Sequence, residues 1–309
     1  MSSISGVLQV VLSFLNLVNT ILHILGGYLL TCQYRYGVQT SNQLFLINLS
    51  ISEGTLNILE ILTIPINGIE SISEQVVRTI DDCQYYVKIV RGYGCVVMYY
   101  LTMVYLTLDK LFDILLNIRY PLYWREEYTK RLLKATWGIT LTIAITASIV
   151  HYFYQVEFHE ILDTYAYPIL DVIFILIALV TYGFIFHKYK QTRRPPVGGM
   201  TAIPSPGRFQ IFMKSRFFIP VLLITTFITF MAIPDMISPY CIHHIWEDRS
   251  NAENTMIRIS FAVSYLSDAI IYIWVKFSVR RLLLIKLGFS RPLRSTTIQP
   301  PAHLRVTPV

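Results

Sequence analysis

Seven long, mainly apolar stretches alternate with short polar segments along the chain. They cover residues 6–33, 43–69, 85–116, 132–154, 165–189, 209–240 and 256–277. A helix of about 20 apolar residues crosses the roughly 30 Å hydrocarbon core of a bilayer, and it pairs its own backbone polar groups. The pattern therefore predicts an all-α membrane protein, a bundle of seven transmembrane helices.

The chain after the seventh stretch has a different pattern. Residues 278–289 alternate basic and apolar side chains, which predicts a short amphipathic eighth helix at the membrane surface. Arg280, Arg281 and Lys286 would then lie near anionic headgroups. Residues 290–309 are expected to form a disordered cytoplasmic tail. The first stretch has no basic segment before it and is too long for a signal peptide, so we expect a transmembrane helix there.

Composition and charge agree with a membrane protein and predict its orientation. The 309 residues are 54% hydrophobic and 15% charged, which is too apolar for a soluble domain of this size. With the N-terminus outside, 21 of the 26 lysines and arginines fall in cytoplasmic segments, as the positive-inside rule requires. Because the basic residues are interleaved with apolar runs, the net charge of +7 does not indicate nucleic-acid binding. We expect a multi-pass plasma-membrane protein with a cytoplasmic C-terminus.

Several local motifs occur in a fixed order along these stretches. The second stretch opens with residues 41–53 (SNQLFLINLSISE), which place Glu53 at membrane depth. The third ends with Asp109 and Lys110, followed by Tyr-Pro-Leu-Tyr at residues 120–123. Trp137 lies in the fourth stretch, Tyr182 in the fifth, and Asp268-Ala-Ile-Ile-Tyr272 in the last. The order and spacing of these motifs are more specific than any one of them.

Taken together, these motifs resemble those of rhodopsin-like (class A) G-protein-coupled receptors. The resemblance implies an extracellular ligand, a heterotrimeric G protein as partner, and coupling through Asp109, Lys110, Tyr182 and Tyr272. This sequence also departs from the family pattern. Lys110 replaces an arginine, Ala269 replaces a proline, and Ala232 stands where a tryptophan precedes the proline of helix six, Pro234. We therefore interpret the chain as a divergent member.

Glu53 and Asp268 are the expected cation pocket. An unpaired carboxylate in the membrane interior costs roughly 2.5–3.5 kcal/mol, so both side chains should face the inside of the bundle. The resemblance implies that the two acids share Na⁺ or a proton and thereby couple helices two and seven. The alternative is a structural network in which one acid is protonated and bonded to Ser52, Ser264 or Ser267.

The outer half of the predicted bundle is unusually rich in ionisable residues. We expect a ligand-binding region formed by Lys88, Arg91, Asp171, Asp235 and Arg258. The alternative is that these residues pair among themselves or reach the headgroups. By resemblance, amine receptors carry an aspartate where Gly92 stands, and opsins a lysine near Ala262, so both ligand classes are disfavoured.

The four cysteines indicate neither a disulfide framework nor a metal site, because no pair has metal-ligand spacing. Cys83 is close to the family's disulfide position, but the outer loop that should hold its partner has no cysteine. Cys241 is the only other cysteine expected on the outer face. A bridge between Cys83 and Cys241 and a pair of free thiols are both compatible with the sequence.

The function that these features favour is ligand sensing and signalling to a G protein. The rival is an ion- or proton-coupled seven-helix transporter or channel that uses Glu53, Glu60 and Asp268. The two halves of the chain show no internal repeat, which argues against the rival. No catalytic triad, metal-ligand cluster or phosphate-binding loop is present in the sequence, so we do not expect an enzyme.

Overall fold

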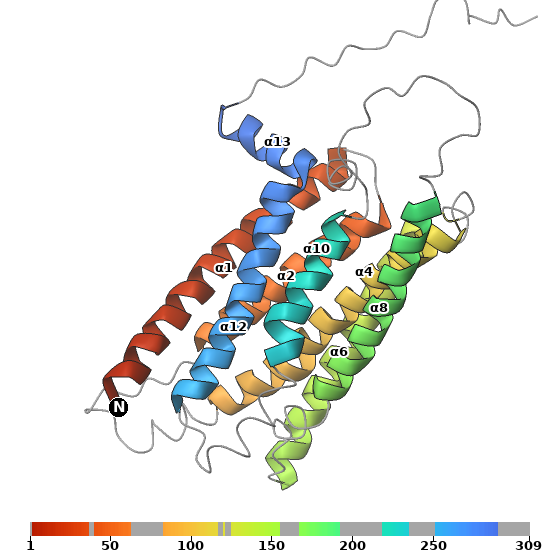
Figure 1. The fold of residues 1–309 in the computed structure, drawn as a ribbon. Coiled ribbons are helices and arrows are strands. Elements are labelled where there is room, and N and C mark those ends of the chain that lie inside the picture. The colour runs from red at the N-terminus through yellow and green to blue at the C-terminus, as the bar shows by residue number, and fades with distance from the viewer. Residues whose placement is uncertain are drawn as a thin grey trace, which may run out of the picture.

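The computed structural model describes residues 2–36, 40–62, 83–116, 120, 125–154, 167–191, 218–234 and 251–289, and these residues contain helices and no strand. Figure 1 shows the helices side by side in one bundle. Three elements are π-helical turns that continue an α-helix, and residues 83–89 form a helical turn before the first of them. The elements are α1 (Ser2–Tyr36), α2 (Ser41–Leu62), η1 (Val90–Val96), α4 (Val97–Leu116), α6 (Glu126–Tyr154), α8 (Tyr167–Gln191), α10 (Phe218–Phe227), η4 (Ile228–Ala232), α12 (Asn251–Ile270), η5 (Ile271–Val275) and α13 (Phe277–Lys286).

Six of the helical stretches are long and apolar enough to cross a membrane. They are Val7–Arg35, Ser41–Leu62, Cys83–Asp113, Glu126–Tyr154, Tyr167–Phe184 and Ile257–Val275. The sixth predicted span, 209–240, is described only over residues 218–234, which contain a shorter apolar helix, Val221–Ala232. An all-helical, multi-pass membrane protein is therefore the architecture, and a seventh crossing stays a prediction.

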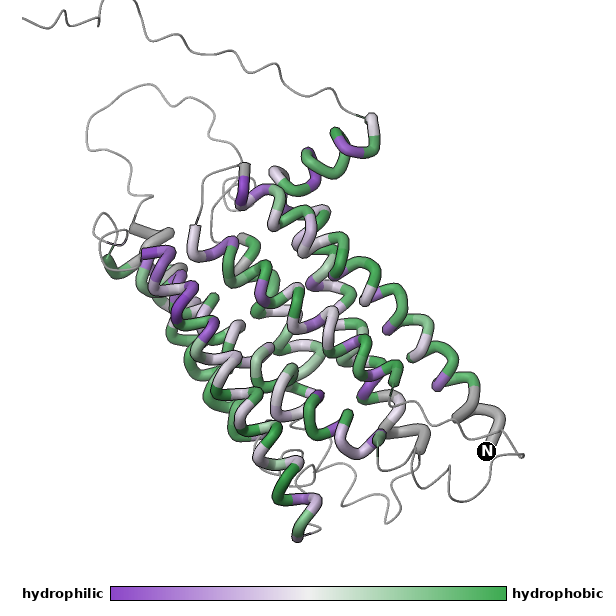
Figure 2. Tube along the Cα trace, turned by 180° about the vertical axis from the view of Figure 1, so that it is seen from behind, coloured by the Kyte–Doolittle hydropathy of each residue, from purple (hydrophilic) through white to green (hydrophobic). Residues whose placement is uncertain are grey.

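The outward faces of the helices are apolar, as contact with lipid requires. Side chains such as Ile139, Phe153 and Phe186 are more than half exposed. Figure 2 shows hydrophobic residues along the full length of the helices, with hydrophilic ones between them. So much exposed apolar surface is unfavourable in water, whereas it is favourable in contact with the hydrocarbon core of a bilayer.

Two of the helices, α2 and α6, begin earlier than the apolar stretches that predict them. The second helix starts at Ser41, because Thr40 caps it with a side-chain acceptor 3.3 Å from the amide of Gln43. The fourth begins at Glu126, and its first turn holds two glutamates that favour the positive end of the helix dipole. Hydropathy misses such polar first turns, so these helices begin two and six residues before the apolar stretches that start at residues 43 and 132.

Successive long helices run in alternating directions (Figure 1), so the bundle has two ends. We call the one nearest Ser2 the N-terminal end, and the one nearest Phe277 the α13 end. α1 packs against α2 and α12, α4 against α2 and α8, and α10 with η4 against α12. α13 lies against α1, where Lys286 Nζ donates to the Tyr28 hydroxyl at 2.8 Å.

Aromatic rings fill the bundle between α4, α8, α10 and α12. Phe227 lies 4.5 Å from Phe174, 5.1 Å from Tyr100 and 5.7 Å from Tyr99, measured between ring centroids. Tyr99 is also edge-on to Tyr265, at 5.6 Å. Such pairs contribute about 0.5–1.5 kcal/mol each beyond their buried area, so this cluster joins four helices.

The π-helical turn η4 ends two residues before Pro234. Pro234 has no amide hydrogen, so it cannot donate to the Phe230 carbonyl four residues earlier. The hydroxyl of Ser260 on α12 donates to that carbonyl instead, at 2.9 Å. The proline therefore creates an acceptor that a neighbouring helix satisfies.

Candidate functional site

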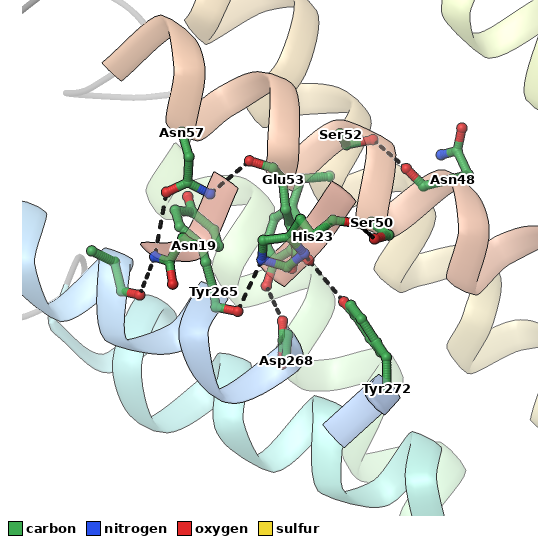
Figure 3. Close-up of polar contacts among 12 residues, drawn as sticks. Asn19, His23, Asn48, Ser50, Ser52, Glu53, Asn57, Tyr265, Asp268 and Tyr272 are labelled. Atoms are coloured by element: carbon green, nitrogen blue, oxygen red, sulfur yellow. Dashed lines mark hydrogen bonds and ion pairs between the residues drawn. The ribbon is translucent and has the colours of Figure 1, made fainter. Parts of the chain in front are cut away.

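Glu53 of α2 and Asp268 of α12 are both completely buried in the middle of the bundle (Figure 3). Figure 3 shows the two side chains directed toward the same part of the bundle from facing helices. Two ionised carboxylates close together repel each other, so a pair of this kind calls for a proton or a cation. The structure thus brings together the two acids of the predicted cation pocket.

Two tyrosine hydroxyls bind this acid pair. Tyr272 of η5 donates to Glu53 Oε2 at 2.8 Å, and Tyr99 of α4 donates to Asp268 Oδ2 at 3.2 Å. The serines expected as alternative partners do not take this role. Ser52 and Ser267 donate to carbonyls of their own helices, as serines in apolar helices often do.

His23 is a third ionisable member of this site, and the sequence analysis missed it. Its Nε2 lies 3.0 Å from the Tyr265 carbonyl, which only accepts, so Nε2 carries the hydrogen. Its Nδ1 then faces Glu53 Oε2 at 3.1 Å. Either the imidazole or the carboxyl carries a further proton at this contact, because two bare lone pairs would repel. We call His23, Glu53 and Asp268, with Tyr99 and Tyr272, the core acid site.

Amide side chains surround the core acid site toward α1. Asn57 donates to the Glu53 carbonyl at 2.7 Å, and Asn19 donates to the Ala262 carbonyl at 2.8 Å. Some buried polar atoms here have no hydrogen-bond partner among the described residues: Asn19 Oδ1, Glu53 Oε1, Ser264 Oγ and Asp268 Oδ1. Buried oxygens of this kind call for a proton, a water or a hard cation.

A transition-metal site would need several histidine, cysteine or carboxylate ligands close together. Within the described part of the chain, no group of three or more His, Cys, Asp or Glu side chains is arranged to hold a metal ion. A monovalent cation such as Na⁺ needs oxygen ligands only, which Glu53 and Asp268 offer. Na⁺ binding therefore stays a prediction.

A second buried network joins α2, α4 and α6. Trp137 Nε1 donates to Asn48 Oδ1 at 2.7 Å, and Asn48 Nδ2 donates to Thr102 Oγ1 at the same distance. This is the tryptophan that the motif spacing singled out. It satisfies its polar atom inside the bundle, which is the behaviour of a structural tie.

Asp109 and Lys110 lie buried at the α13 end of α4. Lys110 Nζ is 2.9 Å from Asp109 Oδ2, and Tyr120 donates its hydroxyl to Asp109 Oδ1. Burial and the negative charge of Asp109 raise the pKa of Tyr120, so this tyrosine stays a donor. Asp109 is thus engaged on both carboxylate oxygens.

Lys276 is a residue at this end that the motifs did not indicate. It lies just after η5 and outside the span Ile257–Val275, with extended backbone between η5 and α13. Burial, and to a smaller extent the charge of Lys110, together lower the pKa of Lys276 from 10.5 to about 8. The sequence signal was weak, because Lys276 is simply the first basic residue after the Asp268 motif.

The other two predicted coupling residues lie elsewhere. Tyr182 donates to the Val221 carbonyl of α10 at 2.8 Å and is 3.1 Å from the hydroxyl of Thr225. Tyr272 belongs to the core acid site. In this structure the four expected coupling residues therefore form one pair, Asp109 with Lys110, and two separate contacts.

The expected ligand-binding residues are only partly together. Arg91 and Arg258 both bind the carboxylate of Glu60 at the N-terminal end, which joins η1, α12 and α2. The alternative was that ionisable residues in this half of the bundle pair with one another. It holds for Arg91 and Arg258, because both pair with Glu60. Lys88 is exposed on the turn before Arg91, and Asp171 is buried on α8. Asp235 lies outside the described residues.

The predicted disulfide is not tested. Cys83 is an exposed free cysteine, whereas Cys241 lies outside the described residues. Cys95 is buried and Cys32 is partly buried, which is common for free cysteines, since they pack as small apolar side chains.

Comparison with protein families and with curated proteins found no match. Any function must therefore be argued from the residues and the geometry described above.

Proposed function

We propose that this protein is a receptor that senses an extracellular ligand and signals to a heterotrimeric G protein at the α13 end. The observation that carries the proposal is the buried Asp109–Lys110 pair, located where the motif resemblance expects the coupling site. The asymmetry of charge supports the same end as cytoplasmic. Such a receptor needs no catalytic residues, because ligand binding shifts the population of two conformations.

The core acid site has a natural role in this proposal. It joins α1, α2, α4 and α12 through ionisable groups in an apolar bundle, where such groups are costly. A site that gains or loses a proton or Na⁺ would change the contacts between these helices. It would therefore bias the equilibrium between the two conformations.

The test is constitutive Gα recruitment in cells that express the wild type at matched surface levels. Lys110→Ala should abolish the signal, since losing one charged contact of about 1.5–3 kcal/mol weakens binding by roughly ten- to a hundredfold. Lys110→Arg should retain it. Lys130→Ala is the matched control, because Lys130 is an exposed lysine at the same end that pairs with Glu126.

If Lys110→Ala keeps the signal and Lys130→Ala loses it, the coupling site does not include Lys110. If neither the wild type nor Lys110→Ala gives a signal, the next measurement is ion flux in the wild type and in Glu53→Gln. Loss of an ion current in that variant would support the transporter or channel alternative.

A further inference from the structure

Glu60, two residues before the end of α2, binds two arginines that come from different helices. Arg91 of η1 binds its Oε2, and Arg258 of α12 binds its Oε1. The Glu60 side chain is only 8% exposed, so its charge needs partners of opposite sign. We call Glu60, Arg91 and Arg258 the Glu60 triad. It joins three helices through charge, at the N-terminal end of the bundle.

The position of Arg91 depends on the π-helical turn η1, which continues into α4. A π-helical turn holds one residue more than an α-helical turn, and one residue of an α-helix corresponds to about 100° of rotation around the axis. In a regular α-helix, Arg91 would therefore lie on another side relative to α4. Single π-helical turns inside α-helices are frequent at functional sites.

Charge, rather than packing, holds α12 to α2 at this end. α2 packs mainly against α1, α4 and η1, and only slightly against α12. In the middle of the bundle, the core acid site links α2 to η5, where Tyr272 binds Glu53. Nearer the N-terminal end, the contact between Glu60 and Arg258 links α2 to α12. Such a contact can open without breaking a packed interface.

The Glu60 triad is closed in a conformation that keeps the predicted coupling residues apart. Lys110 contacts Asp109, whereas Tyr182 binds α10 and Tyr272 binds α2. A contact that forms in only one of two conformations shifts the population toward that conformation. The closed triad would therefore favour the state in which the coupling residues are separate.

We propose that the Glu60 triad is an autoinhibitory contact that holds the receptor in the conformation that does not recruit Gα. While both arginines bind Glu60, α12 stays joined to α2 and to η1. When Arg258 leaves Glu60, α12 loses its link to the end of α2. This inference rests on the proposed function, since it assigns the control of the same signal to the opposite end of the bundle.

The experiment measures basal Gα recruitment by the full-length receptor in cells, at matched surface levels. Glu60→Gln keeps the size of the side chain and removes the charge that both arginines bind. The basal signal should rise by roughly tenfold, because one charged hydrogen bond shifts a two-state equilibrium by about that factor. Glu127→Gln is the matched control, because it makes the same change at an exposed glutamate of α6. It should leave the signal unchanged.

Two further variants separate control of the signal from a merely structural role. Arg258→Gln should raise the basal signal as Glu60→Gln does, since it also releases α12 from α2. Arg258→Lys should raise it less, because lysine keeps one positive charge beside Glu60. Adding Lys110→Ala to Glu60→Gln should return the signal to background. A merely structural triad would lower the melting temperature in detergent and would not raise the signal. If Glu60→Gln does not reach the cell surface, the two Arg258 variants decide.

Four results would contradict the proposals, and they can be told apart. A basal signal that Lys110→Ala abolishes, but that neither Glu60→Gln nor Arg258→Gln raises, would refute the inference alone. A fall of the signal in Glu60→Gln would show that the triad favours the active conformation, and the inference would be wrong. A rise in Glu60→Gln that survives Lys110→Ala would support the inference and refute the coupling site. No signal from any variant would refute the proposed function, and the autoinhibitory role with it.

Discussion

Glu53 accepts a hydrogen bond from the Tyr272 hydroxyl and lies beside His23, and Asp268 faces the same part of the bundle from α12. The sequence could predict that Glu53 and Asp268 meet, because both acids had to avoid lipid. It could also have found His23. Asn16, Asn19 and His23 recur at helical spacing on α1, and all three are buried. The apolar residues around them hide this pattern, because three polar side chains lower the mean hydropathy of a long span only slightly.

Tyr272→Phe tests this residue-level picture. The substitution keeps the ring and removes the donor to Glu53, so a buried carboxyl oxygen loses a partner. We expect the free energy of unfolding to fall by about 1–2 kcal/mol, as for interhelical hydrogen bonds in membranes and buried polar groups in general. Thermal unfolding of the purified protein in detergent measures it. Tyr128→Phe, on an exposed residue of α6, should change stability by less than about 0.5 kcal/mol. Equal losses in the two variants would show that the Glu53 contact contributes nothing.

At the scale of elements, apolar length predicted which segments are helices, and local capping decided where they begin. The early starts of α2 and α6 come from Thr40 and from Glu126 with Glu127, which hydropathy counts as loop. The π-helical turns were not predictable from periodicity. η4 depends on Pro234 together with Ser260, a residue on another helix. A tertiary contact of this kind has no local signature.

A double-mutant cycle tests the origin of η4. Ser260→Ala alone leaves the Phe230 carbonyl without its donor, and we expect a loss of about 1 kcal/mol in unfolding free energy. In a Pro234→Ala background the amide of residue 234 can donate to the same carbonyl, so Ser260→Ala should cost less than about 0.5 kcal/mol there. The difference between the two backgrounds is the coupling energy. A cost that is the same in both would show that proline does not create the need for Ser260.

At the scale of the whole molecule, hydropathy and charge predicted a multi-pass helical bundle, and the six long helices agree. Sequence alone could not show which ionisable residues pair. Arg91 and Arg258 converge on Glu60, which joins η1, α12 and α2. This arrangement depends on how helices distant in the chain pack together. The seventh crossing stays a prediction, because the structure describes only residues 218–234 of the expected span 209–240.

The number of crossings decides on which side of the membrane each terminus lies. Six crossings would leave both termini on the same side of the membrane, whereas seven place them on opposite sides. The concentration of basic residues at the α13 end favours seven, with that end in the cytoplasm. An N-terminal epitope should therefore bind antibody on intact cells, and a C-terminal epitope only after permeabilisation.

If both epitopes are reached without permeabilisation, or neither is, the number of crossings is even. The helix formed by α10 and η4 would then not cross the membrane, and the receptor proposal would lose its architecture. If only the C-terminal epitope is reached, the number of crossings is odd but Lys110 faces the outside of the cell. The G-protein coupling proposed for Lys110 would then be wrong.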